Sequence, residues 1–216
     1  MKTGNLEELR ARLSWVVDFN ATQTDQDFRG RATNANEHID NELNLAYRRE
    51  VNEAKLRKEM SFLRKHSFTW TASATTLAIP AGLKNHRVLE LRDSTDSTPG
   101  TVITLGDDET GFYVYDVDTW GWNPAPSSAR TLVASYIANP TWMEAEADEP
   151  LLIPIPHREL LVWSAAINMH KVAPITDSAT YQQWVADQDR LQFAWHKELA
   201  RGSPSGTPPA HIRNTD

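Results

Sequence analysis

The stretch NEHIDNELNLAYRREVNEAKLRKEMSFLRK, residues 36–65, decides the fold of this chain. Its apolar residues recur every three or four positions, apart from a two-residue step at Leu56, and neither Gly nor Pro interrupts them. This periodicity predicts one long helix, about 40 Å in length at the usual rise per residue. A helix of that length in a chain of 216 residues needs other elements packed beside it.

The next stretch, HSFTWTASATTLAIPAG at residues 66–82, changes the period to two. Apolar residues alternate with Thr and Ser from Phe68, and Pro80 to Gly82 predicts a turn. Further apolar runs follow, separated by turn signals and without helical patterns between them. This arrangement predicts an antiparallel sheet or a small sandwich. The runs are Val88–Leu91, Val102–Ile103, Phe112–Tyr115 and Leu132–Ile137.

Helical periodicity flanks the β-rich region on both sides. An amphipathic helix is expected over Asn5–Asp18, with Asn5 as its N-cap. After a Pro-rich entry at Pro150–Pro156, the segment Leu160–Met169 is apolar on nearly every face, which is typical of a buried helix. A last amphipathic helix is expected from about Tyr181 to Arg201.

The order of these elements predicts an α+β fold. The N- and C-terminal helices form a helical bundle, with an inserted antiparallel β-rich module and an extended, Pro-rich C-terminal tail. The predicted parts are 1–66 for the N-terminal helices, 67–140 for the β-rich module, 141–201 for the C-terminal helices and 202–216 for the tail.

Composition argues against several classes of protein. The chain has no cysteine, so a disulfide framework, a thiolate zinc site and a cysteine nucleophile are excluded. The apolar run Leu160–Met169 is too short to span a bilayer. The N-terminal stretch carries charged side chains where a signal peptide needs an uncharged stretch. We therefore expect no membrane association and no secretion.

Charge is unevenly distributed along the chain. The net charge of −7 argues against a protein whose main function is to bind the phosphate backbone of nucleic acids. Residues 48–66 nevertheless carry a basic excess of four, and residues 93–149 an acidic excess of ten. Such a molecule can dock onto copies of itself or onto a partner with the opposite pattern. The residues expected at a boundary between subunits are Arg57, Lys58, Arg64 and Lys65.

The usual catalytic and metal-binding motifs are missing from the sequence. The seven His residues are scattered, and no Gly-rich phosphate loop or nucleophile elbow is present. We expect structural roles for His157 and His170, because each is a single imidazole near an apolar helix. The protein is predicted to have no enzymatic activity, no metal and no cofactor.

Two alternatives remain in the β-rich module. Asp116 and Asp118 lie close to Trp120 and Trp122, and glycosidases use paired carboxylates near aromatic side chains. A solvated turn at the two aspartates is favoured over a hydrolase site. The other alternative is a binding module in which Trp120 and Trp122 contact a glycan or a partner protein.

Four features of the chain resemble the head-to-tail connector, or adaptor, proteins of tailed bacteriophages. They cover most of the chain, roughly residues 36–199, whereas Asp107–Arg130 does not match the family's pattern. The features are the long helix, the strand entering TLAIPAG (76–82) and then RVLEL (87–91), the segment DEPLLIP (148–154) leading to PHRELLV (156–162), and a final helix with Tyr181 near its start.

The resemblance implies a structural virion protein of the neck, assembled in the host cytoplasm. Its implied partners are the portal protein, the tail or nozzle proteins and itself, in a ring of twelve copies. DNA is then expected to pass through the ring without sequence-specific binding. The C-terminal tail is expected to contact the portal, with Ile212, Arg213 and Asp216 as anchors.

Overall fold

The structure of the protein is a computed structural model that describes residues 4–17, 35–96, 100–104, 111–172 and 176–201. These residues form two compact units. The helical unit contains the described residues up to Ser61 and those from Pro140 onward, and the β unit is Phe62–Asn139. The mixture of helices and antiparallel sheets confirms the predicted α+β class.

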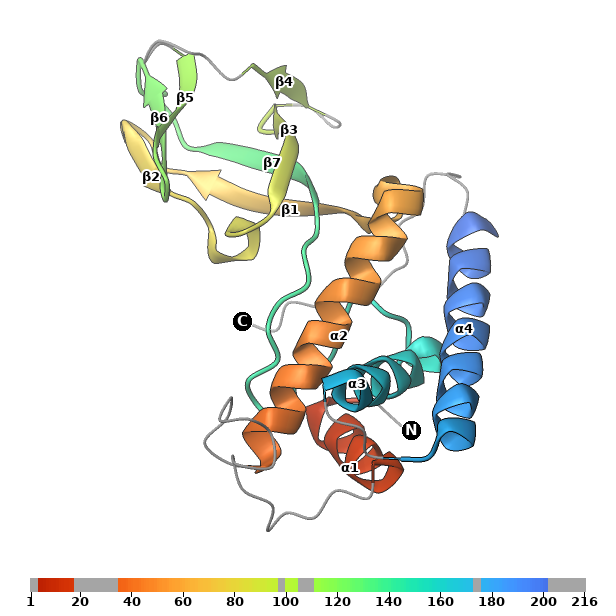
Figure 1. Cartoon of the computed structure of the whole chain (residues 1–216). Coiled ribbons are helices and arrows are strands. Elements are labelled where there is room, and N and C mark those ends of the chain that lie inside the picture. Colours follow the sequence, from red (N-terminus) through yellow and green to blue (C-terminus); the bar gives the residue numbers. More distant parts are fainter. Residues whose placement is uncertain (1–3, 18–34, 97–99, 105–110, 173–175, 202–216) are drawn as a thin grey trace. The chain divides into compact units, whose positions relative to one another are not determined.

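The described part of the helical unit is built on four α-helices (Figure 1). α3 (Glu159–Val172) packs against α1 (Leu6–Val16), α2 (Ala35–Lys58) and α4 (Ser178–Arg201). α1 and α4 also contact α2. Helices from both ends of the chain therefore form one bundle, as predicted.

α3 supplies the core of this bundle. The short 3₁₀ turn η4 (Ile155–His157) precedes the helix, and it places Pro156 in a first turn, where the missing N–H costs little. The apolar run is confirmed as a helix that is buried on most sides. Its buried residues are Leu160, Leu161, Val162, Ser164, Ala165, Ala166, Ile167 and Met169.

α1 begins with the predicted cap. The Asn5 side chain accepts a hydrogen bond from the backbone N–H of Glu8 at 3.0 Å. The Glu8 carboxylate in turn accepts from the N–H of Gly4 at 2.8 Å. These reciprocal bonds satisfy donors at the helix start that have no partner within the helix. The helix buries Leu6, Leu9 and Leu13.

The long helix is shorter than the sequence predicts. α2 ends at Lys58, the 3₁₀ turn η2 (Glu59–Phe62) follows, and β1 (Leu63–Trp70) begins at Leu63. The prediction of one helix to residue 65 is therefore wrong in its last turns. Every residue of β1 has a partner on one neighbouring strand, and this pairing prevails over helix propensity where no Gly or Pro marks the change.

The β unit contains two antiparallel sheets (Figure 1). One has the strand order β1-β7-β3-β4, and the other has the order β2-β6-β5. The pairing of β1 with β7 runs from Leu63 opposite Ile137 to Trp70 opposite Arg130. The remaining strands are β2 (Thr76–Ala78), β3 (Arg87–Asp93), β4 (Thr101–Ile103), β5 (Gly111–Asp116), β6 (Thr119–Asn123) and β7 (Arg130–Ile137).

The core of the β unit is rich in aromatic side chains. Trp70 and Phe112 pack edge to face, with ring centroids 5.6 Å apart. Strand β6 lies in the stretch that did not match the family pattern, and its Trp120 is part of this core. The buried core residues are Trp70, Leu83, Leu91, Phe112, Trp120, Leu132 and Ala134.

Candidate assembly surface

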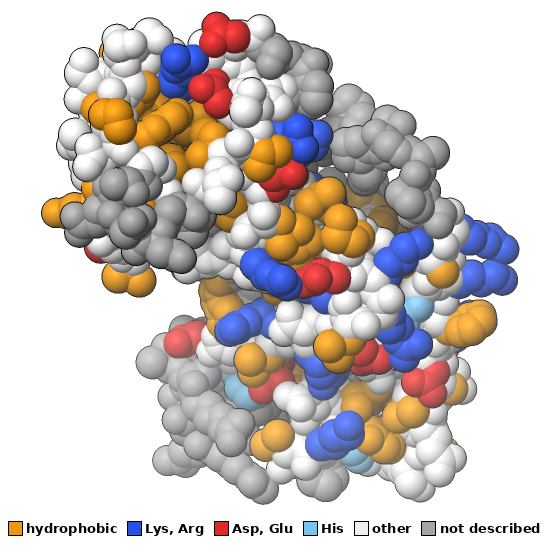
Figure 2. Space-filling model, turned by 90° about the horizontal axis from the view of Figure 1, so that it is seen from above, with side chains coloured by type: hydrophobic (Ala, Val, Ile, Leu, Met, Phe, Trp, Pro, Cys, Tyr) orange, Lys and Arg blue, Asp and Glu red, His pale blue; other side chains and the backbone are white. Residues whose placement is uncertain are grey.

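The four basic residues predicted at a subunit boundary do not lie on one element. Arg57 and Lys58 end α2 in the helical unit, whereas Arg64 and Lys65 lie on β1 in the β unit. On the face drawn in Figure 2, Lys and Arg side chains lie in several separate places, with acidic and hydrophobic side chains between them. The basic helix of the sequence analysis is therefore divided between a helix of one unit and a strand of the other.

Arg57 and Lys58 have intramolecular partners. The Lys58 ammonium donates to the backbone carbonyl of Ala200, at 3.1 Å, in the last turn of α4. A cation at this position is favoured because carbonyls at a helix C-terminus have no partner within the helix. Arg57 pairs with Glu53 at 3.4 Å, one turn earlier in the same helix. Reversing these charges would disturb the helical unit as well as any interface.

The acidic section at residues 93–149 is also divided. Its acidic residues up to Asp118 belong to the β unit, and those from Glu144 belong to the helical unit. Within the β unit, Arg130 lies 3.5 Å from the carboxylate of Asp93 and 3.1 Å from that of Asp96. The charge excess seen along the sequence is thus distributed over two surfaces, and part of it is neutralised internally.

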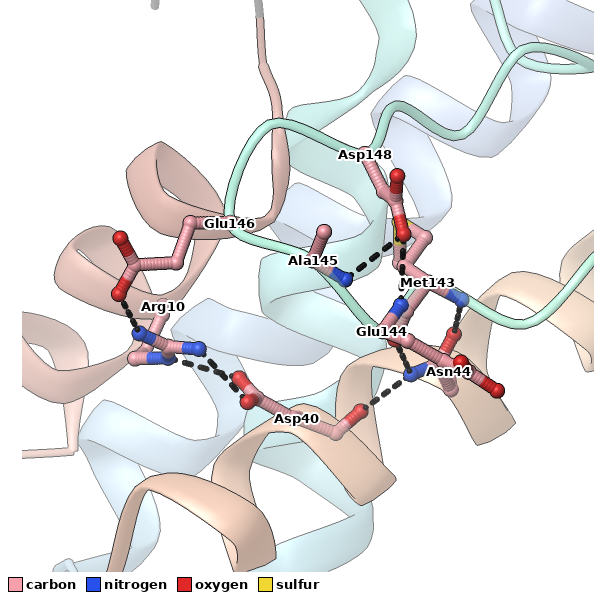
Figure 3. Close-up of polar contacts among 8 residues, drawn as sticks. All are labelled: Arg10, Asp40, Asn44, Met143, Glu144, Ala145, Glu146 and Asp148. Atoms are coloured by element: carbon pink, nitrogen blue, oxygen red, sulfur yellow. Dashed lines mark hydrogen bonds and ion pairs between the residues drawn. The ribbon is translucent and has the colours of Figure 1, made fainter.

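In the helical unit, several acidic side chains hold a strap, residues 140–154, against the helices. Arg10 on α1 pairs with Asp40 on α2 at 2.7 Å and with Glu146 of the strap at 3.2 Å (Figure 3). Hydrogen bonding to Asp40 and the neighbouring charges raise the pKa of Arg10. The Asp148 side chain accepts from backbone N–H groups of the strap itself.

Backbone groups of the strap are satisfied by the helices. The side chain of Asn44 on α2 accepts from the N–H of Met143 at 2.8 Å and donates to its carbonyl at 2.9 Å (Figure 3). The N–H of Leu6 donates to the carbonyl of Asp148 at 2.8 Å. The strap is thereby fixed to α1 and α2 by main-chain and side-chain hydrogen bonds. Its acidic residues Glu146 and Asp148 take part in these structural contacts.

A shallow polar depression lies between the start of α2 and the strap. It is open to solvent and has an acidic lining. Among the residues that the structure describes, no group of three or more His, Asp and Glu side chains is arranged to hold a metal ion. The lining residues are Asn36, Glu37, Asp40, Asn41, Trp142, Met143 and Glu144.

A buried polar network joins α2, α3 and α4. Glu50 is fully buried, and its carboxylate accepts from the Ser164 hydroxyl and from the side-chain amides of Gln188 at 3.2 Å and Gln192 at 2.9 Å. Arg49 lies 3.6 Å from the same carboxylate. A buried carboxylate is costly unless its oxygens are well satisfied, and here α3 and α4 supply the hydrogen-bond donors.

The alternative of a binding module that uses Trp120 and Trp122 conflicts with the packing of these residues. Trp120 is buried, and its ring centroid lies 5.6 Å from Phe68 and 5.5 Å from Phe112. Trp122 is half-buried and packs edge to face on Trp70 at 5.5 Å. The binding module that we considered needs both indole rings at the surface. Because Trp120 is packed in the core, its ring is not available to contact a glycan.

The aspartate pair forms a turn, as the favoured interpretation predicts. Asp116 ends β5, Asp118 lies in the two-residue turn before β6, and both are exposed. The Asp116 carboxylate accepts from the backbone N–H of Asp118 at 2.8 Å, and Lys84 lies 3.4 Å from Asp118. These contacts fix the conformation of an exposed hairpin turn.

The two His residues singled out in the sequence have structural partners. The His157 Nε2 atom lies 2.6 Å from the Glu198 carboxylate of α4. The His170 ring stacks on Tyr181, with centroids 4.4 Å apart. Both contacts join α4 to the segment that contains α3, as expected of side chains with structural roles.

The sequence matches the SU10 adaptor protein family over residues 5–207, which include the helical unit and the β unit. The chain belongs to this family. It is a bacteriophage adaptor protein and a component of the virion, in agreement with the resemblance of its sequence. No curated protein matches the adaptor significantly. None of its described helices has the length and apolar character needed to cross a membrane.

The predicted portal anchors of the adaptor, Ile212, Arg213 and Asp216, lie outside the described residues. Portal contact through the C-terminal tail therefore stays a prediction. The adaptor does expose apolar side chains in both described units, at places that the sequence analysis did not identify. The most exposed of them are Val117, at the tip of the β5–β6 hairpin, and Leu56, on α2.

Proposed function

We propose that the adaptor forms a ring that joins the portal to the tail and surrounds the channel through which DNA leaves the head. The observation that carries this proposal is the family match, because it extends from residue 5 to residue 207 and includes both compact units. The resemblance of the sequence implies twelve copies, a position in the neck of the virion, assembly in the host cytoplasm, and tail or nozzle proteins as further partners.

The distribution of charge supports a channel wall that does not retain DNA. The net charge is −7, and several arginines are engaged within the protein. Arg10 pairs with Asp40, and Arg158 pairs with Glu149 at 2.7 Å. Affinity for DNA depends on cations that neutralise phosphates, and cations already paired with carboxylates contribute little. We infer that DNA passes without sequence-specific binding.

We also propose that the adaptor has no enzymatic activity. The carboxylates that could be catalytic, Asp116 and Asp118, lie in an exposed turn and bond to local groups. Replacing both with Asn should leave phage infectivity at its original level, or reduce it only as far as folding is reduced. A large loss of infectivity with normal assembly and normal thermal stability would contradict the proposal.

The mass of the adaptor tests the ring directly. Native mass spectrometry of the purified protein, alone and after mixing with portal rings of the same phage, should detect a multimer of adaptor subunits on the portal. Truncation after Arg201 should lower affinity for the portal and leave the thermal stability of the adaptor unchanged. An adaptor that stays unbound in the presence of its portal would overturn the proposed function.

A further inference from the structure

The tip of the β5–β6 hairpin exposes an apolar residue between two carboxylates. We define the hairpin tip as residues 115–118. Val117 is 94% exposed, and Asp116 and Asp118 flank it. Tyr115 adds a second exposed apolar surface. Exposed apolar side chains that are grouped together and rimmed by charge are typical of interaction sites.

The hairpin tip is held in one conformation. Asp116 accepts from the N–H of Asp118 at 2.8 Å, and the Asp118 carbonyl accepts from the N–H of Ile79 at 2.7 Å. Lys84 lies 3.4 Å from the Asp118 carboxylate. A tip fixed by bonds on both sides loses little conformational entropy when it docks.

α2 presents a complementary surface on its outer side. We define the outer stripe as Leu45, Arg48, Arg49, Asn52 and Leu56, which helical spacing places along one face. All five residues are exposed, Leu45 by 47% and Leu56 by 89%. The stripe thus has a Leu towards each end and two guanidinium groups between them.

Part of the positive charge of the outer stripe is available for a partner. The nearby carboxylates of Glu42 and Glu50 are buried, and that of Glu50 lies 3.6 Å from the Arg49 guanidinium, so Arg49 is partly engaged within its own chain. Arg49 donates to the carbonyl of Ser164 at 3.1 Å, yet 42% of its side chain remains accessible. Arg48 is also exposed. The stripe therefore offers cations and apolar surface together, and the hairpin tip offers anions and apolar surface together.

The two surfaces also match in size. Leu45 and Leu56 are eleven positions apart, about 16 Å along a helix. Two hydrogen-bonded strands lie about 5 Å apart, so a hairpin tip with its side chains fits between the two leucines. Val117 would then contact Leu56, with the carboxylates on either side of it directed at Arg48 and Arg49.

We propose that the hairpin tip of one adaptor subunit docks on the outer stripe of α2 in the next subunit. This contact rests on the proposed ring, and it names the surfaces that join neighbouring subunits. The two surfaces are different parts of the chain, as a head-to-tail contact requires, and such contacts form rings when their rotation closes. Opposite charges at the contact fix its register and disfavour other pairings.

Site-directed cross-linking tests this contact, because the chain has no native cysteine. Val117→Cys and Asn52→Cys chains are prepared separately, mixed with and without portal rings, and treated with a short bis-maleimide. We expect a cross-linked dimer in the mixture that greatly exceeds the background of either variant alone. Val102→Cys mixed with Asn52→Cys is the matched control, because Val102 is an exposed valine of the same β unit.

The possible outcomes distinguish a failure of the proposed contact from a failure of the proposed ring. Ring formation without the Val117–Asn52 cross-link would overturn the contact and leave the proposed function intact. Failure of the adaptor to bind its portal would contradict the proposed function itself. A third chain that carries both substitutions is treated in parallel. A cross-link that forms only within that chain would show that the tip docks on its own α2, and would overturn the intermolecular contact.

A charge exchange provides a second measurement. Arg48→Glu and Asp118→Lys should each reduce ring formation at least several-fold at low salt, and the two variants mixed in equal amounts should recover part of the loss. Phe193→Asp, at an exposed hydrophobic residue of α4, is the control and should assemble like the unmodified chain. Equal assembly of all variants would argue against the contact.

Discussion

The guanidinium of Arg10 forms a two-pronged pair with the carboxylate of Asp40, with Nε 2.8 Å from one oxygen and Nη2 2.7 Å from the other. The pair joins α1 to α2, and the remaining Arg10 nitrogen reaches Glu146 of the strap. Both side chains of the pair are about four-fifths removed from solvent. A planar fork matches a carboxylate in a way that a lysine ammonium cannot.

Replacement of Arg10 by Ala should therefore lower the free energy of unfolding of the helical unit by about 1–3 kcal/mol. Arg10→Lys should recover only part of this loss, because it restores the charge without the fork. Chemical denaturation followed by circular dichroism measures both. Arg190→Ala is the matched control, since the Arg190 side chain is 74% exposed and its single-pronged pair with Asp187 should contribute less than about 1 kcal/mol. Equal losses at Arg10 and Arg190 would contradict the assignment.

Gly121 leaves room for a tyrosine on the neighbouring strand. It lies opposite Tyr113 in the β5–β6 pairing, and a Cβ atom added to it would be 2.3 Å from the Tyr113 ring. Gly121→Ala should cost the β unit about 1–3 kcal/mol of stability, because the ring must move from its position. The same change in a Tyr113→Ala background should cost much less, which thermal unfolding of the unmodified protein and the three variants measures. Equal costs in both backgrounds would refute the steric explanation.

Much of the fold was predictable from period and turn signals. Leu160–Met169 reads as a buried helix in the sequence because nothing polar breaks it except Ser164 and Asn168, and α3 is that helix. Most strands with β-branched or aromatic runs were also predicted, but β6 (Thr119–Asn123) was not. The end of α2 was not, because Leu63 continues the helical spacing and only pairing with β7 places it in a strand.

The sites were less predictable, because contacts over long sequence separations decide which charges are engaged. Lys58 looks like part of a basic run, but its partner is a carbonyl of α4. Trp120 looks like a surface platform beside two aspartates, but it packs on Phe68 in the core. One local signal was available: Asp-Val-Asp between two apolar runs predicts a hairpin turn that exposes Val117, and this residue is central to the proposed contact.

Glu50 should be essential for the packing of α4. Glu50→Ala leaves the donors of Ser164, Gln188 and Gln192 without their shared acceptor, and should cost at least about 2 kcal/mol. Glu50→Gln should be intermediate, because one acceptor oxygen is replaced by a donor. Denaturant titration gives the values. Glu53→Ala is the comparison on the same helix: Glu53 also accepts from Gln192, at 3.1 Å, but it is half-exposed, so its effect should stay below about 1 kcal/mol.

The start of α4 should respond to acid through Asp177. Its carboxylate accepts hydrogen bonds from the N–H of Ala179 at 2.9 Å and from the N–H and hydroxyl of Thr180 at 3.0 and 2.8 Å. These bonds, chiefly those from Thr180, lower the pKa of Asp177. A lowered pKa in the folded state means that the charged form stabilises the fold. This contribution is complete above the unfolded pKa, about 3.9, and is lost as the pH falls through the lower folded value.

Asp177→Asn should therefore reduce the melting temperature at pH 7, because the amide keeps an acceptor oxygen but not the charge at the helix start. The difference between the unmodified and variant proteins should narrow as the pH falls below about 3.9, the pKa of the unfolded chain, and towards the lower pKa of the folded state. Thermal melts at pH 7, 5, 4 and 3 measure this, and Asp189→Asn, exposed in the middle of α4, should show no such narrowing. A difference that is the same at every pH would mean that Asp177 stabilises α4 by hydrogen bonding alone, without its charge.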